Sequence, residues 1–281
     1  DGYRHARGFA TRRGDAQKGI IDTTNSAMTR PTIIAGPCVI EPNGVLDEVA
    51  RHIAELNTTL GTDIVLKASF DKANRTSITS YRGVGMERGL EMLAEAKSRY
   101  GLRITTDIHE AWQAEPVSQV ADIVQIPALL SRQTDLIAAA ARHAKVVNIK
   151  KGQMLSAEDM RHAYIKAIES GAKEVWLTER GNMFGYNNLV VDFRNIVDMH
   201  TFAPTVIMDC THSVQRPGGM GTKSGGNREM IPHMALAAKA FGADGYFFEV
   251  HPTPDEALCD GANSLSLDDL EITLTSLLSN K

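Results

Sequence analysis

After Thr32 the sequence repeats one pattern eight times: a short run of β-branched and apolar residues, then a longer segment with helical spacing. Most of the short runs are continuously apolar rather than alternating, which is typical of parallel strands covered on both faces. The expected strands are residues 32–39, 63–68, 103–108, 122–126, 145–149, 174–178, 205–208 and 245–250. This pattern indicates an α/β protein built from strand–helix units.

The segments between the strands carry apolar residues every three or four positions, as in a helix with one buried face. Val45, Val49 and Ile53 follow the first strand in this way, and Leu267 and Leu270 follow the last. An open doubly wound sheet is an alternative, but no glycine-rich dinucleotide motif follows the first strand. Eight strand–helix units in 281 residues therefore predict a single closed (β/α)₈ barrel, the TIM barrel.

Residues 1–30 differ from the rest of the chain. They are polar, rich in arginine and lysine, and show neither a helix nor a strand period. Segments of this kind have no apolar face to dock and usually stay mobile. We therefore expect a flexible N-terminal tail over residues 1–30 and a catalytic barrel domain over residues 31–281.

Composition limits the location and the partners. The net charge of −4 gives no reason to expect nucleic acid or an anionic membrane as a partner. The chain has no apolar run of roughly 18 residues for a membrane span, and its N-terminus lacks the apolar core of a signal peptide. Three cysteines form no disulfide framework and suit a reducing compartment. We expect a cytoplasmic protein with no membrane partner.

Polar or ionisable residues stand at the end of every expected strand. In (β/α)₈ barrels the catalytic groups come from the carboxyl ends of the strands, so these residues should meet at one mouth. In chain order they are Cys38, Lys67, Asp107, Gln125, Lys150, Arg180, Asp209 with His212, and Glu249. Any one of them could be a solvated loop residue, but eight in register predict a functional site.

One part of this set is cationic. Its members are Lys67, Lys72, Arg75, Lys150 and Arg180. Hydrogen bonds from such groups to phosphate or carboxylate are charge-assisted and stronger than neutral ones. Salt bridges to helix carboxylates could explain any single member, but not all five at the same mouth. The sequence therefore predicts an anionic ligand.

Another part offers softer donors. Cys38, His212 and Glu249 stand at three strand ends, and Asp260 follows the last strand. Thiolate, imidazole and carboxylate are ligands for Zn²⁺, Fe²⁺ or Mn²⁺, and the first, seventh and eighth strands adjoin in a closed barrel. A nucleophilic Cys38 with His212 as its base is the competing interpretation.

The loop "RPGGMGTKSGGNRE", residues 216–229, has five glycines in fourteen residues. It is too long and too rich in glycine for a tight connection between a strand and a helix. We expect a mobile lid over the barrel mouth, the alternative being a disordered insertion.

Several motifs, in order at successive strand ends, closely resemble the 3-deoxy-D-manno-octulosonate 8-phosphate synthases. They include "IIAGPCVIE", "KASFDKANRTS", "TTDIHE", "VNIKKGQ", "DCTHSVQRPGG" and "FFEVHPTPDEALCDGANSL". The resemblance covers about residues 32–270. It implies a TIM barrel, usually a homotetramer, that acts in lipopolysaccharide synthesis. The reaction implied joins phosphoenolpyruvate, D-arabinose 5-phosphate and water, and releases inorganic phosphate.

The sister family of 3-deoxy-D-arabino-heptulosonate 7-phosphate synthases is the nearest alternative. It also carries "AGPC" but takes erythrose 4-phosphate, and it typically has Lys-Pro-Arg-Thr-Ser where this chain has "KANRTS". The inserted Ala-Asn form favours arabinose 5-phosphate as the cosubstrate.

The resemblance implies a role for each matching residue. The phosphoenolpyruvate pocket would comprise Lys67, Lys72, Gln125, Lys150 and Arg180, with Ser69 and Ala128 as further substrate contacts. The sugar phosphate would bind Asn74, Arg75 and Ser77, with Asp107 near the sugar hydroxyls. The catalytic set implied is Lys67, Lys72, Asp107 and His212.

Cys38, His212, Glu249 and Asp260 match the four metal ligands of the metal-dependent branch, whereas the metal-independent branch has Asn in place of Cys38. The "CDG" motif that begins at Cys259 is more typical of the metal-independent branch. We expect a divalent metal ion with Cys38 as a ligand and Cys259 only as a neighbour. A non-catalytic sugar-phosphate sensor would not need these four donors, and a zinc hydrolase would keep less room for its water.

Overall fold

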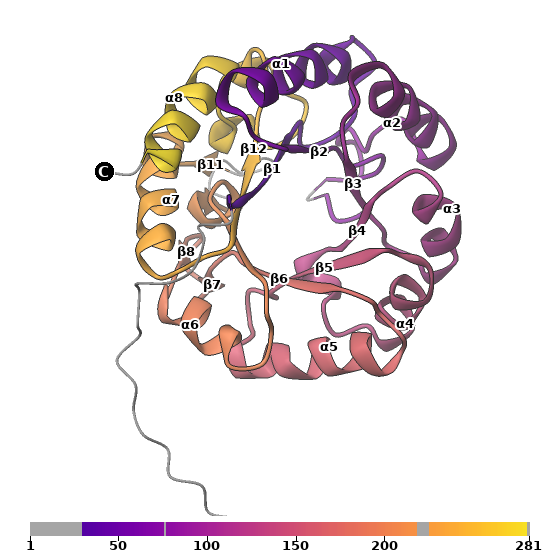
Figure 1. Cartoon of the computed structure of the whole chain (residues 1–281), viewed down its shortest axis with the longest axis vertical. Coiled ribbons are helices and arrows are strands. Elements are labelled where there is room, and N and C mark those ends of the chain that lie inside the picture. The colour runs from indigo at the N-terminus through magenta and orange to yellow at the C-terminus, as the bar shows by residue number, and fades with distance from the viewer. Residues whose placement is uncertain (1–29, 76, 218–224, 280–281) are drawn as a thin grey trace, which may run out of the picture. The chain divides into compact units, whose positions relative to one another are not determined.

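The structure is a computed structural model that describes residues 30–75, 77–217 and 225–279. Eight parallel strands close into a barrel in the order β1, β12, β9, β6, β5, β4, β3, β2 (Figure 1). Their bounds are β1 Thr32–Gly36, β2 Val65–Lys67, β3 Ile104–Asp107, β4 Ile123–Ile126, β5 Val146–Lys150, β6 Val175–Glu179, β9 Val206–Asp209 and β12 Gly245–Glu249. Each overlaps one of the expected runs, so the predicted TIM barrel is confirmed.

Eight α-helices surround the strands in the part of the chain that the structure describes (Figure 1). They are α1 Val45–Leu60, α2 Met86–Tyr100, α3 Ala114–Ser118, α4 Thr134–His143, α5 Ala157–Glu169, α6 Arg194–His200, α7 Ile231–Ala240 and α8 Leu267–Leu278. In α1 the buried face comprises Val49, Ile53 and Leu56 among others, as the spacing predicts. Asp47 and Glu48 lie in its first turn, where their negative charges interact favourably with the positive end of the helix dipole.

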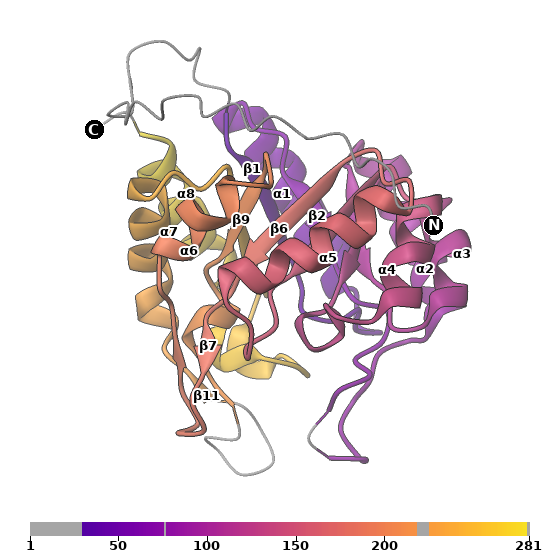
Figure 2. The ribbon, with the colours of Figure 1, turned by 90° about the horizontal axis from the view of Figure 1, so that it is seen from below.

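Short strands and 3₁₀ turns lie in the connections between the barrel strands and the helices. Two antiparallel pairs join β7 Asn182–Met183 to β8 Leu189–Val190, and β10 Gln215–Arg216 to β11 Gly225–Gly226. The 3₁₀ turns are η1 Ala111–Gln113, η2 Ala128–Leu130, η3 His212–Val214, η4 Arg228–Met230, η5 Pro254–Glu256 and η6 Gly261–Asn263. Figure 2 shows β7 and β11 projecting together from one end of the barrel.

The core of the described residues has two main parts and a third, small cluster of Cys38, Val39 and Cys259. A large cluster fills the space between strands and helices, and a smaller one fills the barrel interior. The interior cluster comprises Ile34, Val65, Ile123, Trp176, Ile207 and Phe247. Because these side chains pack the interior, the barrel is not a pore, and a ligand can enter only among the loops at its end.

The first strand ends earlier than the sequence predicts. We expected it to run to residue 39, but β1 stops at Gly36. The next residue is Pro37, which lacks the amide hydrogen that would continue the ladder. An isolated bridge between Val39 and Ser69 keeps the following segment against β2. Cys38 therefore lies just past the strand, at the barrel mouth.

Two predictions fall on residues outside the described part of the chain. The tail prediction concerns residues 1–29, and the core of the lid prediction concerns residues 218–224. At the base of the lid loop, Gln215 pairs with Gly226 and Arg216 with Gly225. Both predictions stay predictions. Among the residues that are described, no helix is long and apolar enough to cross a membrane.

Candidate active site

A cavity of about 520 Å³ opens among the loops that follow the strands. Most of the predicted site residues line it, namely Lys67, Lys72, Asn74, Arg75, Asp107, Gln125, Ala128, Lys150, Arg180, His212 and Asp260. Cys38, Ser69 and Glu249 are buried, and each contacts a residue of that lining. The strand-end rule thus brings the predicted residues together in one place. Ser77 is the exception, because it is absent from the lining and its Oγ contacts Thr79 Oγ1 at 3.0 Å.

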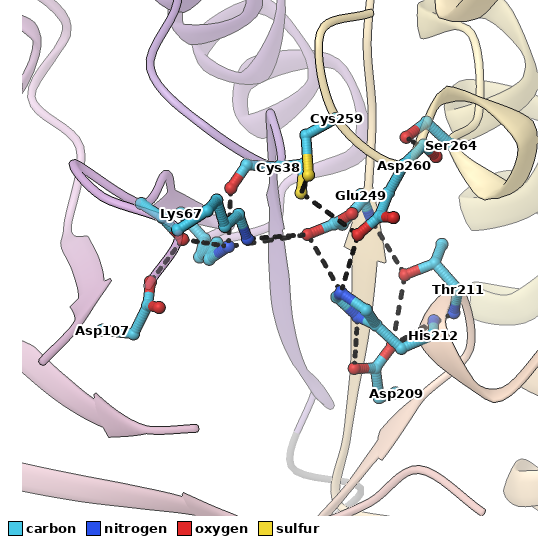
Figure 3. A network of polar contacts seen from close by, with 12 residues as sticks. Cys38, Lys67, Asp107, Asp209, Thr211, His212, Glu249, Cys259, Asp260 and Ser264 are labelled. Atoms are coloured by element: carbon cyan, nitrogen blue, oxygen red, sulfur yellow. Dashed lines mark hydrogen bonds and ion pairs between the residues drawn. The ribbon is translucent and has the colours of Figure 1, made fainter. Parts of the chain in front are cut away.

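The floor of the cavity on the β2 and β3 side is a chain of polar contacts that begins at Lys67 (Figure 3). Lys67 Nζ donates to the Cys38 carbonyl at 3.2 Å and to Ser69 Oγ at 3.0 Å. Ser69 Oγ donates in turn to Asp107. Burial opposes ionisation of Asp107, but Lys67 and the hydrogen bond from His109 outweigh it and lower its pKa well below the usual range. A charged carboxylate therefore lines the cavity and can accept hydrogen bonds there.

Gly36 explains why the first strand can approach this chain of contacts. A Cβ on Gly36 would lie only 1.9 Å from the carbonyl oxygen of Lys67. No larger residue fits without moving one of the two strands. The Gly-Pro pair therefore sets two features at once, close packing of β1 on β2 and the end of β1 just before Cys38.

Two more cations lie at the ends of β5 and β6. Lys150 Nζ lies 2.6 Å from Asp209 Oδ2 and 3.6 Å from the centre of the Phe247 ring. Burial and repulsion from Lys67 lower the pKa of Lys150, although Asp209 opposes them. Arg180 is 5% exposed, and its Nη2 donates to Gln215 Oε1 at 3.1 Å. These buried cations favour an anionic ligand that would replace the solvation they have lost.

His212 is held from behind by Asp209. Asp209 Oδ2 lies 2.7 Å from His212 Nδ1, and Asp209 Oδ1 accepts hydrogen bonds from the backbone N–H groups of Thr211 and His212. On the other side of the ring, His212 Nε2 lies 3.3 Å from Glu249 Oε1 and 3.9 Å from Asp260 Oδ2. Asp209 can accept a hydrogen bond from Nδ1–H, and in that tautomer the Nε2 lone pair would be available to a cation. The sequence pattern marks Asp209 as a strand-end residue and assigns it no role.

Glu249 is completely buried at the end of β12. Neither of its carboxylate oxygens accepts a hydrogen bond from any described residue. Burial opposes its ionisation, but His212, Lys72 and Lys67 outweigh it and bring the pKa of Glu249 far below its ordinary value. Lys67 Nζ and Lys72 Nζ lie 3.5 and 4.0 Å from Oε1. A buried, charged and incompletely satisfied carboxylate is what a cation site requires.

The four predicted ligands fit a divalent ion by the chemistry of their donor atoms. His212, Glu249 and Asp260 offer atoms within 4.8 Å of one another, and Asp260 belongs also to a second such group with Cys38 and Cys259. Cys38 Sγ lies 3.4 Å from Asp260 Oδ2. Burial and the neighbouring Cys259 raise the pKa of the Cys38 thiol well above its usual value. A bound ion would supply the positive charge that a thiolate needs there.

The loop that carries Asp260 has a demanding backbone. Asp260 is left-handed, with φ of 51°, and a Cβ on Gly261 would lie 2.1 Å from the Pro254 carbonyl oxygen. The amide of Leu258 donates to Glu41 Oε1 at 2.9 Å, and Glu41 is buried. Aspartate tolerates the left-handed region better than most residues. The Asp-Gly pair is therefore explained by the turn that presents Asp260 to the cavity.

Comparison with known proteins identifies the family to which the chain belongs. The family model described as "DAHP synthetase I family" matches residues 16–279. The chain belongs to the DAHP synthetase I family. Three curated relatives are named "2-dehydro-3-deoxyphosphooctonate aldolase". The one from Syntrophotalea carbinolica is 50% identical over 259 residues, which cover 92% of this chain and 94% of the relative.

The other two relatives give a similar picture. The Fusobacterium nucleatum protein is 53% identical over 242 residues, covering 86% of this chain and 87% of its own. The Helicobacter pylori protein is 50% identical over 269 residues, covering 91% of this chain and 97% of its own. This similarity extends over nearly the whole barrel.

In this member of the DAHP synthetase I family, the "KANRTS" segment lies beside the Asp260 loop. Arg75 Nη1 lies 2.6 Å from Cys259 Sγ, and Arg75 Nη2 donates to the Leu258 carbonyl at 3.4 Å. Cys259 Sγ in turn lies 3.0 Å from Cys38 Sγ. The sequence predicts Cys259 only as a neighbour of the expected metal ligand Asp260. The structure adds direct contacts of Cys259 with Cys38 and with Arg75.

Proposed function

We propose that the chain condenses phosphoenolpyruvate with D-arabinose 5-phosphate and water. The products would be 3-deoxy-D-manno-octulosonate 8-phosphate and inorganic phosphate, in lipopolysaccharide synthesis. The observation that carries the proposal is one cavity with two cationic regions. Lys150 and Arg180 lie against Asp209 and Gln215, while Arg75 lies against the Asp260 loop. Two phosphorylated substrates need two such regions, and the names of the relatives support this assignment.

The first region would bind phosphoenolpyruvate. Lys67, Lys150 and Arg180 are all at least nine-tenths buried, so their charges act in a medium that screens them weakly. They would bind its phosphate and carboxylate, with the remaining contacts coming from Ser69, Lys72, Gln125 and Ala128. The second region would bind the sugar phosphate through Asn74 and Arg75, which line the cavity, and Ser77 would have to turn from Thr79 to join them. Asp107, held ionised by Lys67, would accept hydrogen bonds from the sugar hydroxyls.

The two cationic regions would hold side by side two anions that repel each other in solution, and this proximity would allow them to react. C3 of phosphoenolpyruvate attacks the aldehyde carbon, a C–C bond forms, and the aldehyde oxygen takes up a proton. Water adds at C2 and loses a proton. The C2–O bond to phosphate then breaks, and phosphate leaves with the bonding electron pair. The remaining proton of the added water passes to the departing phosphate, so that C2 becomes a ketone. Lys67, Lys72, Asp107 and His212 line the cavity where these protons move.

We infer further that the enzyme is metal-dependent. Cys38, His212, Glu249 and Asp260 would hold a divalent ion such as Zn²⁺, Fe²⁺ or Mn²⁺, which would polarise the aldehyde or help to activate the water. The support is the donor chemistry of the four residues and the unsatisfied carboxylate of Glu249. The family resemblance adds two expectations, a homotetramer and a cytoplasmic location.

Steady-state release of inorganic phosphate tests the proposal. Phosphoenolpyruvate is supplied with arabinose 5-phosphate, with erythrose 4-phosphate, or with no sugar. We expect rapid release only with arabinose 5-phosphate. Equal release with erythrose 4-phosphate would favour the heptulosonate reaction instead. Release without any sugar would indicate a hydrolase, and no release in any arm would favour a sugar-phosphate sensor.

A further inference from the structure

Cys259 differs from an ordinary packed thiol. It is 4% exposed, and its Sγ lies 3.0 Å from Cys38 Sγ. The same sulfur accepts a hydrogen bond from Arg75 Nη1 at 2.6 Å. Cys210 offers a contrast within the same chain. It is fully buried in the large hydrophobic cluster, and its Sγ lies 3.6 Å from the Met208 carbonyl. Cys259 packs in a small cluster with Cys38, Val39 and Tyr81, but it also contacts the Arg75 guanidinium and joins the lining of the cavity.

The donor atoms around Asp260 form two groups rather than one. Cys38, Cys259 and Asp260 lie within 4.8 Å of one another, and so do His212, Glu249 and Asp260. Asp260 is common to both groups, so an ion bound to Asp260 lies next to both sulfurs. Figure 3 shows Cys38 and Cys259 beside Asp260, with a dashed line from the Cys38 sulfur to the Asp260 carboxylate. Cys259 Sγ thus lies within 4.8 Å of the Asp260 carboxylate, as Cys38 Sγ does, and is close enough to Cys38 Sγ to share an ion with it.

The charges nearby suit a second sulfur ligand. Arg75 and Lys72 bring positive charge to the sulfur side of the site, where Arg75 Nη1 contacts Cys259 directly. Hydrogen bonds from cationic donors to a metal-bound sulfur are a known way in which proteins stabilise such ligands.

We propose that Cys259 is a further, second sulfur ligand, which binds the divalent ion together with Cys38, His212, Glu249 and Asp260. The inference rests on the metal dependence proposed above and deepens it. Two sulfurs would make the site selective for thiophilic ions such as Zn²⁺ or Cd²⁺ over Mn²⁺. The Arg75 contact would also connect the sugar-phosphate loop directly to a metal ligand.

Cobalt(II) absorption tests this, because each sulfur–metal bond adds to the sulfur-to-metal charge-transfer band. Five proteins are stripped of metal: the unmodified chain, C259S, C38S, the double variant C38S/C259S and the control C210A. They are kept anaerobic, so that the thiols do not join, and titrated with Co²⁺ to saturation. Cd²⁺ affinity is measured in parallel by competition with a chromophoric chelator, and phosphate release is assayed on the same samples.

We expect the charge-transfer band of C259S and of C38S to fall to roughly half, that of the double variant to vanish, and that of C210A to stay unchanged. Cd²⁺ affinity of C259S should fall at least about tenfold. An unchanged band in C259S would overturn this inference alone. Failure of the unmodified chain to bind Co²⁺ would overturn both this inference and the metal proposal. Loss of the sugar-dependent reaction from the unmodified chain would count only against the proposed function.

Discussion

Asp209 and His212 form a carboxylate–imidazole pair in which Asp209 Oδ2 lies 2.7 Å from His212 Nδ1. The pair turns His212 Nε2 toward Glu249 and Asp260, 3.3 and 3.9 Å away. Asp209 is completely buried and also neutralises Lys150. It therefore supports both halves of the site without lining the cavity itself.

Asp209→Asn should weaken metal binding and turnover about 10- to 100-fold, because an amide no longer fixes the imidazole with Nε2 free. Metal content after dialysis against a chelator and the rate of phosphate release measure the two effects. Asp244→Asn is the matched control. Asp244 Oδ2 lies 3.4 Å from His200 Nε2, and neither residue lines the cavity. Equal losses in both variants would show that the effect of Asp209 is general destabilisation.

Arg75→Ala should raise KM for arabinose 5-phosphate roughly 10- to 100-fold, as expected for the loss of a charge-assisted hydrogen bond. KM for phosphoenolpyruvate should change far less. Arg82→Ala in the same loop is the control, because Arg82 pairs with Asp71 and is 55% exposed. A matched rise in KM for both substrates would mean that Arg75 serves the whole cavity, and the assignment to the sugar phosphate would be lost.

Cys38→Ser should lose most activity and bind metal weakly, since it removes a soft ligand. Cys38→Asn should retain measurable activity that resists chelation, because Asn is the residue of the metal-independent branch at this position. Turnover is measured before and after exhaustive chelation, with the metal content determined each time. In the unmodified chain, chelation should abolish turnover and a divalent transition ion should restore it. Full activity of that chain with metal near zero would rule out metal dependence.

The stability of the barrel should depend on pH through Asp122. Its Oδ2 accepts hydrogen bonds from Lys97 Nζ at 2.7 Å and from Ile104 N–H at 2.9 Å. Burial opposes ionisation of Asp122, but these two bonds outweigh it and lower its pKa. The stabilisation is therefore complete above the pKa of the unfolded chain, about 3.9, and disappears as pH falls through the lower folded value.

Asp122→Asn should accordingly lower the free energy of unfolding by about 1–2 kcal/mol at pH 7, and the difference from the unmodified chain should shrink toward pH 3. Denaturant unfolding at several pH values measures this. Asp63→Asn is the control: Asp63 pairs with Arg103 but is 68% exposed, so its removal should cost little. A pH-independent difference for Asp122→Asn would contradict the linkage.

The strands could be predicted because each is a short, continuously apolar run between polar segments. This local signal places every barrel strand within a few residues, and the order of a closed barrel then follows from parallel connections. Boundaries were less predictable, as at Pro37, where the missing amide hydrogen ends β1 early. The same strand-end rule located Lys67, Lys150, Arg180 and Glu249.

The contacts of Cys259 could not be predicted in this way. Cys38 and Cys259 are 221 positions apart, and Arg75 and Cys259 are 184 apart. They meet only because the barrel closes β1 onto β12, and because the loop backbone at Asp260 and Gly261 turns toward the mouth. No local pattern encodes that turn. The support that Asp209 gives to His212 is local in sequence, and a buried acid three residues before a candidate ligand histidine is the signal that could have found it.

Direct competition between the two aldoses tests the central claim most directly. Phosphoenolpyruvate is offered to the enzyme with equimolar arabinose 5-phosphate and erythrose 4-phosphate, and the products are separated and weighed by mass spectrometry. We predict that the eight-carbon 3-deoxy sugar acid phosphate forms almost alone, with one phosphate released for each molecule made. Predominance of the seven-carbon product, or phosphate release with neither product, would contradict the account.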